Sequence, residues 1–354
     1  MMIPRERLLA ALDRREPDKL PKNISFTEPA YKVFREKTGA DNPADYFGLE
    51  ARIVNFAPTK HAIDFSIYLP DLPEGAVVTE WGIGELHRPD THYYRYASPM
   101  RGLTTIAQVM AYPFPDITAD YRHAHLEKEV ATFKDQGWAV GGAVTPGDGA
   151  FFECAWLLRG LDLLLEDLVA RPELAEALLD RVVELSAFMA ERYAQAGVDF
   201  IFTGDDVGTE RGMLMSPAMW RRFLKPRLAR VIRAAKRVTP RIHIFYHSDG
   251  NCEPIIPELI EIGVTTLNPV QPECMDPAKL KRQFGDRLAF WGTVGTQTTM
   301  PFGTPDEVRA VVWERFQTVG RGGGLVIAPT QVIEPDVPWE NIVAFFEAVE
   351  ECVY

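Results

Sequence analysis

The chain has 354 residues, 46% of them hydrophobic, which is enough to bury a large core. Its formal net charge is −12, which argues against nucleic acid or an anionic membrane as the main partner. Its four cysteines form no Cys-x-x-Cys pair and no disulfide framework, and no apolar segment is long enough for a signal peptide or a bilayer span. We therefore expect a soluble, cytoplasmic protein.

The first 120 residues contain few regular elements. Residues 5–14 carry leucines on one face and predict an amphipathic helix. A short strand candidate at 22–26 and a helix at 30–38 follow. Residues 41–120 are less regular and rich in Pro, Tyr and Trp, with aromatic segments between 81 and 96 that suggest an antiparallel hairpin. We interpret 41–120 as an irregular or antiparallel elaboration on the main domain.

From about residue 121, helices and strands alternate. The predicted strands are nearly continuously apolar, as parallel strands covered on both faces should be, and they span residues 138–144, 199–203, 242–247, 265–270, 288–292 and 324–328. The predicted helices are 121–136, 152–169, 172–196, 217–237, 254–261, 277–284, 305–319 and 339–353. This spacing predicts a single (β/α)₈ TIM-type barrel over residues 1–354. A doubly wound α/β sheet is the alternative, but no Gly-x-Gly-x-x-Gly turn opens an early helix.

The predicted strand 242–247 delivers a histidine and a carboxylate two residues apart. These are His247 and Asp249, followed by a turn at Gly250. Residues i and i+2 of a strand share a face, so both side chains can converge on a metal ion or on a substrate that needs an acid–base pair. The structural alternative is a helix-capping aspartate beside an ordinary histidine. His243 lies on the same alternation, and we expect it to pack inside the barrel.

The other predicted strands also end in polar residues, which a barrel brings to one mouth. As substrate-binding candidates we take Asp148, Asn268, Gln271, Thr330 and Gln331. Two adjacent aspartates point to different sides, so either Asp205 or Asp206 should face the mouth as a catalytic residue and the other cap a turn. Glu273 and Cys274 follow the same predicted strand as Asn268 and Gln271 and should also lie near the mouth. Their structural alternatives are a solvated loop carboxylate and a small buried hydrophobe.

Several segments together resemble one known family nearly end to end. They are residues 5–12 with 16–18, 204–208 with 216–217, 223–227, His247-Ser248-Asp249-Gly250-Asn251, 259–264, 267–271, and 334–338 with 340–342. In these segments the chain resembles the uroporphyrinogen decarboxylase superfamily. The resemblance implies a (β/α)₈ barrel and is far less specific for the reaction.

One branch of that superfamily decarboxylates the acetate arms of a tetrapyrrole without a cofactor. It holds the substrate carboxylates with an arginine-rich motif near the N-terminus. The corresponding region here offers Lys32 and Arg35 as its basic residues and also carries Glu28. A polyanionic substrate needs several cations to offset its charge. Tetrapyrrole decarboxylation is therefore disfavoured.

The other branch transfers methyl groups, with a corrinoid protein as donor or acceptor, and binds zinc through a His-x-Cys pair and later Glu or Cys residues. His247 matches the histidine, whereas Asp249 stands where the cysteine belongs. Gln271 or Glu273 lies where the later carboxylate belongs, and Thr330 and Gln331 lie where the final cysteine belongs. Oxygen ligands leave a harder, more Lewis-acidic ion than thiolates do, which suits O-demethylation.

The resemblance therefore predicts zinc bound through His247, Asp249 and either Glu273 or Cys274. The alternative is a site without metal, in which His247 and Asp249 act as an acid–base pair. A dimer is also expected by resemblance.

Three functions follow from these alternatives. The first is a methyltransferase that moves a methyl group from a small methoxylated or methylated compound to a separate corrinoid protein, with Asp205 or Asp206 orienting the substrate. The second is a decarboxylase. The third is a non-catalytic small-molecule-binding barrel, which is reasonable because the cysteines of the family's zinc site are missing. Our prediction is the first.

Overall fold

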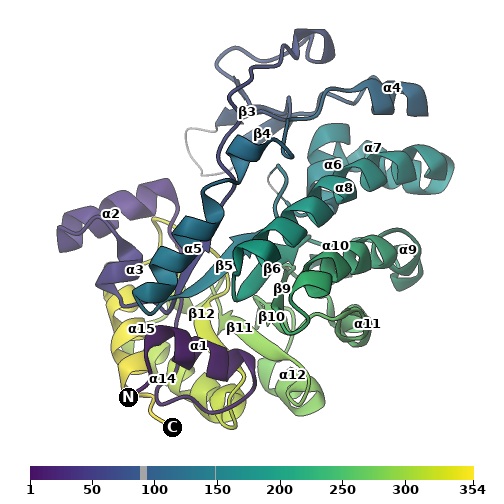
Figure 1. Cartoon of the computed structure of the whole chain (residues 1–354). Coiled ribbons are helices and arrows are strands. Elements are labelled where there is room, and N and C mark those ends of the chain that lie inside the picture. The colour runs from purple at the N-terminus through teal and green to yellow at the C-terminus, as the bar shows by residue number, and fades with distance from the viewer. Residues whose placement is uncertain (88–93, 148) are drawn as a thin grey trace.

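The computed structural model describes residues 1–87, 94–147 and 149–354. Its main sheet has seven parallel strands in the order β1-β5-β6-β9-β10-β11-β12. Spatial order follows chain order throughout, without the reversal that defines a doubly wound sheet. The helices lie outside the curled sheet (Figure 1). This confirms the predicted α/β barrel and excludes the doubly wound alternative.

The predicted strands lie close to the observed ones. The parallel strands are β1 (Ala51–Val54), β5 (Ala139–Ala143), β6 (Phe200–Gly204), β9 (His243–His247), β10 (Thr266–Asn268), β11 (Ala289–Val294) and β12 (Leu325–Pro329). The segment predicted as a strand at 22–26 makes isolated parallel bridges, Lys22 to Ile327 and Phe26 to Ile333. It therefore runs beside β12 without joining the sheet as a full strand.

The helices follow the predicted alternation. They are α1 (Pro4–Leu12), α2 (Glu28–Thr38), α3 (Pro43–Tyr46), α4 (Ile106–Ala111), α5 (Leu126–Asp135), α6 (Phe152–Arg159), α7 (Leu161–Ala170), α8 (Pro172–Ala196), α9 (Pro217–Phe223), α10 (Lys225–Val238), α11 (Ile256–Ile262), α12 (Pro277–Phe284), α13 (Thr299–Phe302), α14 (Pro305–Arg315) and α15 (Trp339–Glu351). Pro172 opens α8 and Gly197 ends it in a left-handed conformation, which are the expected signals at a helix start and a helix end.

The region 41–120 has two kinds of structure. It contributes β1 to the parallel sheet. It also contains a small antiparallel sheet of β2 (Val77–Val78), β3 (Gly84–His87) and β4 (Tyr94–Ala97). In Figure 1 β3, β4 and α4 lie at the top of the view, and α1 and both chain termini lie at the bottom.

The inside of the barrel is a separate apolar cluster. Helix α1 inserts Leu8, Ala11 and Leu12 against Phe200, Phe245, Trp291 and other inward residues of the strands. Inward positions alternate along each strand, so on β9 Phe245 and His247 share the inner face. Since α1 closes the end where the strands begin, the interior is reached from the end where they finish. His247 lies at that open end.

In the part of the chain that the structure describes, every helix is too short or too polar to cross a bilayer.

Candidate active site

A cavity of about 820 Å³ occupies the mouth of the barrel, a size typical of small-molecule sites. Loops after six of the parallel strands contribute to it. Its lining includes predicted residues from the ends of four of these strands: Asp206, His247, Asp249, Gln271, Thr330 and Gln331. The barrel therefore gathers the polar strand ends at one place, as the fold requires.

The orientation of the His247 ring is fixed by Asn268. The ring Nδ1 lies 2.5 Å from Asn268 Oδ1. The amide nitrogen of Asn268 donates to the Trp291 carbonyl oxygen over 2.9 Å. The Asn268 oxygen is therefore the acceptor, and His247 Nδ1 carries the proton. In the neutral ring this leaves the lone pair on Nε2, which is the tautomer that a metal ion or a proton donor needs.

Two carboxylates face the Nε2 atom. Asp206 Oδ1 lies 3.6 Å and Asp249 Oδ1 lies 3.8 Å from His247 Nε2. Both distances are too long for hydrogen bonds. Asp206 is held by the backbone N–H of Asp249, which donates to Oδ1 over 2.7 Å, and Gln331 donates to Asp249 Oδ2 over 2.8 Å. Burial raises the pKa of Asp249. The neighbouring Asp206 carboxylate also raises this pKa, whereas His247 lowers it.

The three side chains fit a metal ion. Among the described residues they are the one group of His, Cys, Asp and Glu whose ligand atoms converge, all within 4.8 Å of one another. A tetrahedral zinc site with ligands at 2.0–2.2 Å separates neighbouring ligand atoms by about 3.4 Å. The His247–carboxylate distances are slightly longer than this. Three protein ligands would leave one position for substrate, as catalytic zinc sites do.

Asp205 does not face the mouth. It is buried, and its Oδ1 accepts hydrogen bonds from the backbone N–H groups of Phe151, Phe152 and Glu153 over 2.8–3.0 Å. It therefore caps the start of α6, the structural role considered for one member of the pair. Burial raises the pKa of Asp205 to about 7 against these hydrogen bonds.

Gly204 allows the ends of β6 and β9 to lie close together. Its φ is +146°, and a Cβ there would lie 2.2 Å from the His247 carbonyl oxygen. Only glycine permits this close approach between the ends of β6 and β9. The approach sets Asp206 beside His247.

The remaining substrate-binding candidates have mixed roles. Gln271 and Thr330 line the mouth and are nearly buried. Gln271 accepts a hydrogen bond from the Gly250 N–H over 3.2 Å, and Thr330 lies 3.2 Å from the Thr296 hydroxyl. Asn268 acts through His247, as described above. Asp148 lies outside the described residues.

The structure does not bring Glu273 and Cys274 to His247. The backbone turns after Gln271, whose carbonyl oxygen accepts from the Cys274 N–H over 2.9 Å. The Glu273 carboxylate accepts instead from the Thr298 hydroxyl over 3.0 Å. Burial and the neighbouring Glu273 raise the pKa of Cys274, which works against a thiolate. Asp206, which we expected only as a catalytic candidate, completes the converging group instead.

The charge of the mouth was not foreseen. Its lining includes Glu153, Asp206, Glu210, Asp249 and Glu334, and none of the described residues that line it is a lysine or an arginine. Glu153, Glu210 and Glu334 were missed because they lie within loops or at a helix start, away from the strand tips. A mouth lined in this way repels a polyanion and attracts a cation.

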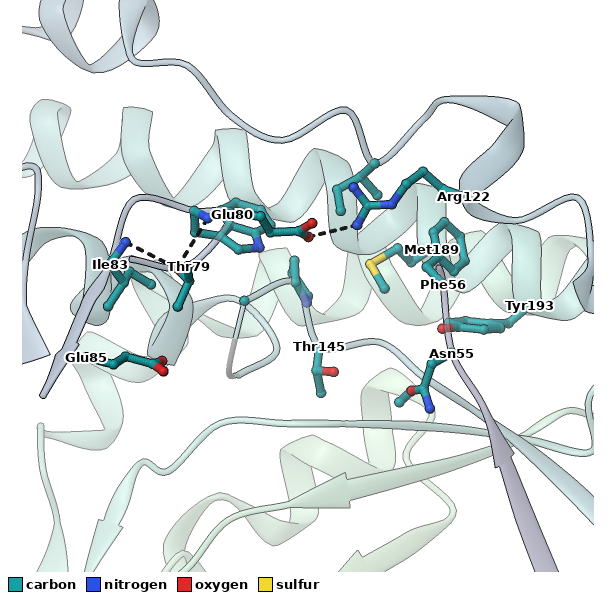
Figure 2. A pocket seen from close by; sticks show the side chains of 15 residues that line it. Asn55, Phe56, Thr79, Glu80, Ile83, Glu85, Arg122, Thr145, Met189 and Tyr193 are labelled. Atoms are coloured by element: carbon teal, nitrogen blue, oxygen red, sulfur yellow. Dashed lines mark hydrogen bonds and ion pairs between the residues drawn. The ribbon is translucent and has the colours of Figure 1, made fainter. Parts of the chain in front are cut away.

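A second cavity, of about 290 Å³, adjoins the mouth and shares Thr145 with it. Figure 2 shows Arg122 pointing toward Glu80 across this cavity, with Thr145 and Asn55 opposite. Arg122 donates to Glu80 over 2.7 Å and to Asp116 over 3.2 Å. Because both carboxylates neutralise Arg122, it provides no free cation for a substrate anion in the mouth.

Comparison with known proteins places this site in a family. The family model for uroporphyrinogen decarboxylase (URO-D) matches residues 143–352, more than half of the chain. The chain belongs to the URO-D family. It is 21% identical over 337 residues to the uroporphyrinogen decarboxylase of Legionella pneumophila, covering 91% of this chain and 89% of that protein. It is 24% identical over 191 residues to that of Coxiella burnetii, covering 52% and 49%.

A solved structure shares the fold of this URO-D family member. A methyltransferase from Methanosarcina mazei superposes with a TM-score of 0.68 at 21% identity, covering 99% of both chains. The likeness supports the α/β barrel along the whole chain. The predicted superfamily resemblance and the fold that it implied are thus confirmed.

Proposed function

We propose that the protein is a methyltransferase that moves a methyl group from a small methoxylated or methylated compound to a corrinoid carried by a separate protein. The observation that carries the proposal is the arrangement of His247 Nε2 between the Asp206 and Asp249 carboxylates, with Asn268 fixing the tautomer. We propose that these residues hold a zinc ion. When bound, that ion supplies a Lewis acid for the leaving oxygen of the substrate.

The charge of the mouth supports methyl transfer over decarboxylation of a tetrapyrrole. A polyanionic substrate needs arginine or lysine partners, and the described lining of the mouth offers carboxylates instead. A neutral methyl ether meets no such repulsion. In the transfer, the bond between methyl carbon and oxygen breaks, and its electron pair stays on oxygen, which takes up a proton. The electron pair of cob(I)alamin forms the new bond to the methyl carbon.

The test is methyl transfer from a panel of methyl ethers and other methylated compounds to added cob(I)alamin, with the protein loaded with zinc. We expect methylcobalamin to accumulate, followed by its visible absorption. Failure with every member of the panel at full metal loading would contradict the proposal. Loss of carboxylates from added uroporphyrinogen would replace it with the decarboxylase alternative, and binding without any turnover would favour the non-catalytic barrel.

A further inference from the structure

A smaller chamber lies inside the barrel beneath His247. Its volume is about 250 Å³, and it shares Phe202, His247, Thr330, Gln331 and Val332 with the mouth. The chamber and the mouth therefore meet at His247. A molecule that fills the chamber can place one substituent beside the His247, Asp206 and Asp249 side chains.

The walls of the chamber combine four aromatic side chains with aliphatic ones. Phe200, Phe202, Phe245 and Trp291 line it. Phe202 and Phe245 stack with centroids 4.6 Å apart, and Trp291 meets Phe245 edge-on at 5.2 Å. The Phe202 ring is also nearly parallel to His247, 6.2 Å away. Aromatic walls favour a flat aromatic guest over an aliphatic one of equal size, by offset stacking and edge contacts.

Apart from His247, the polar side chains among the described residues that line the chamber are uncharged amides and hydroxyls. Asn23, Ser25, Asn268, Thr330 and Gln331 supply amides and hydroxyls. An apolar cavity of about 150 Å³ is enough to hold benzene, so this chamber has room for one substituted ring. The carboxylates of the mouth lie above and disfavour a guest that bears its own carboxylate.

We infer that the substrate is an uncharged, single-ring aromatic methyl ether, with its ring in the chamber and its ether oxygen at His247. This inference rests on the proposed function for its reaction, but the binding of the ring can be measured without it. The chamber provides apolar contact for the aromatic ring. The His247, Asp206 and Asp249 side chains at its rim contact the methoxy group that reacts.

The test is isothermal titration of the metal-free protein, without any corrinoid, with three probes: methoxybenzene, cyclohexyl methyl ether and 4-methoxybenzoate. We expect methoxybenzene to bind about 3–10-fold more tightly than its saturated analogue, from the aromatic contacts. We expect 4-methoxybenzoate to bind at least about tenfold more weakly than methoxybenzene, because of the acidic mouth. Equal affinity for the ring and its saturated analogue, or tighter binding of the carboxylate, would overturn the inference.

Variants locate the ring. Phe202→Leu should remove most of the preference for methoxybenzene over cyclohexyl methyl ether, whereas Phe202→Tyr, which keeps the ring, should retain it. Phe302→Leu, at an exposed phenylalanine outside the chamber, is the matched control and should bind as the parent does. Unchanged preference in folded Phe202→Leu would contradict the chamber as the site. Ring binding without methyl transfer would refute the proposed function alone, and transfer from aliphatic ethers without ring binding would refute this inference alone.

Discussion

Strand β9 carries a histidine at each end, and the two show how differently the barrel uses its two faces. His243, near α1, has its Nε2 atom 3.5 Å from Asp13, and burial lowers its pKa. His247, at the mouth, faces two carboxylates from neighbouring loops and is oriented by Asn268. At the closed face, where the strands begin, charged side chains pair with one another. At the open face, where the strands end, carboxylates line a cavity. In TIM barrels this division separates stability from catalysis.

The closed face shows the same pairing beyond β9. Asp199, at the start of β6, accepts hydrogen bonds from Arg5 of α1 and from the backbone N–H of Val140, and it pairs with Lys134. Glu50 accepts from the Lys22 N–H and from Arg7. These contacts hold α1 and the N-terminal segment against the strands. Disrupting them should change stability, and disrupting the mouth should change activity.

The largest effect is expected from His247→Gln. Loss of a neighbouring outer-sphere residue typically costs a metal site 10–100-fold, so loss of the ligand itself should lower methyl transfer by more than about 100-fold. His243→Gln is the matched control on the same strand and should leave methyl transfer per folded molecule near the parent value. Zinc content and initial rates measure both variants. Equal losses of methyl transfer and zinc in His247→Gln and His243→Gln would contradict the assignment of catalysis to the open face alone.

Asn268→Leu should come next. It removes the acceptor that holds the proton on His247 Nδ1, so zinc affinity should fall by roughly 10–100-fold while folding is retained. Asn268→Asp keeps an acceptor oxygen and should recover most of the affinity. Competitive titration with a zinc chelator measures both. Equal zinc affinities in Asn268→Leu and Asn268→Asp would show that Asn268 does not set the tautomer of His247.

Asp205→Ala tests the assignment of that aspartate to structure. Three N–H groups at the start of α6 lose their acceptor, so the free energy of unfolding should fall by about 2 kcal/mol. Zinc affinity should change little, because Asp205 points away from His247. Denaturant unfolding and chelator competition measure the two quantities. A lost zinc site in a stably folded Asp205→Ala protein would place Asp205 among the ligands after all.

The smallest effect is expected at the closed face, from Asp199→Asn. Burial alone would raise the pKa of Asp199, but Arg5, the Val140 N–H and Lys134 outweigh it and hold that pKa below its usual value. The folded state therefore keeps Asp199 ionised to lower pH than the unfolded chain does. Its contribution, about 1 kcal/mol after allowing for the partial exposure of Arg5, is complete above about pH 4 and is lost as the pH falls further.

Unfolding of parent and Asp199→Asn protein at pH 7 and pH 3 checks this. The two should differ at pH 7 and converge toward pH 3. A difference that grows in acid would have the wrong sign.

Much of the fold could be predicted from sequence because apolar strands and capped helices are local signals. β1 was missed as a strand: it has four residues, one of them Arg52, within an irregular region. The segment at 22–26 was predicted as a strand, but it makes only isolated bridges, to Ile327 and Ile333. Pairing of this kind depends on where α1 and the N-terminal segment pack, which no local pattern records.

The site was predictable in part for the same reason. Two-residue spacing at the end of β9 places His247 and Asp249 together, and adjacency implies that only one of Asp205 and Asp206 faces the mouth. Which aspartate faces the mouth depends on the backbone conformation at Gly204 and on the start of α6. The first is not visible in the sequence, and the second lies about 50 residues away along the chain. Glu273 and Cys274 follow a strand as a ligand should, but the turn at Gln271 directs them elsewhere. The path of a loop follows no sequence period, so the direction of its side chains could not be predicted as it could for a strand.

We propose that Asp206, His247 and Asp249 hold the metal, with Cys274 excluded. X-ray absorption at the zinc edge of the loaded protein tests it most directly. We expect one zinc per chain with nitrogen and oxygen neighbours at about 2.0–2.2 Å, and loss of that zinc in Asp206→Asn. A sulfur neighbour at about 2.3 Å, or zinc retained at full occupancy in Asp206→Asn, would contradict it.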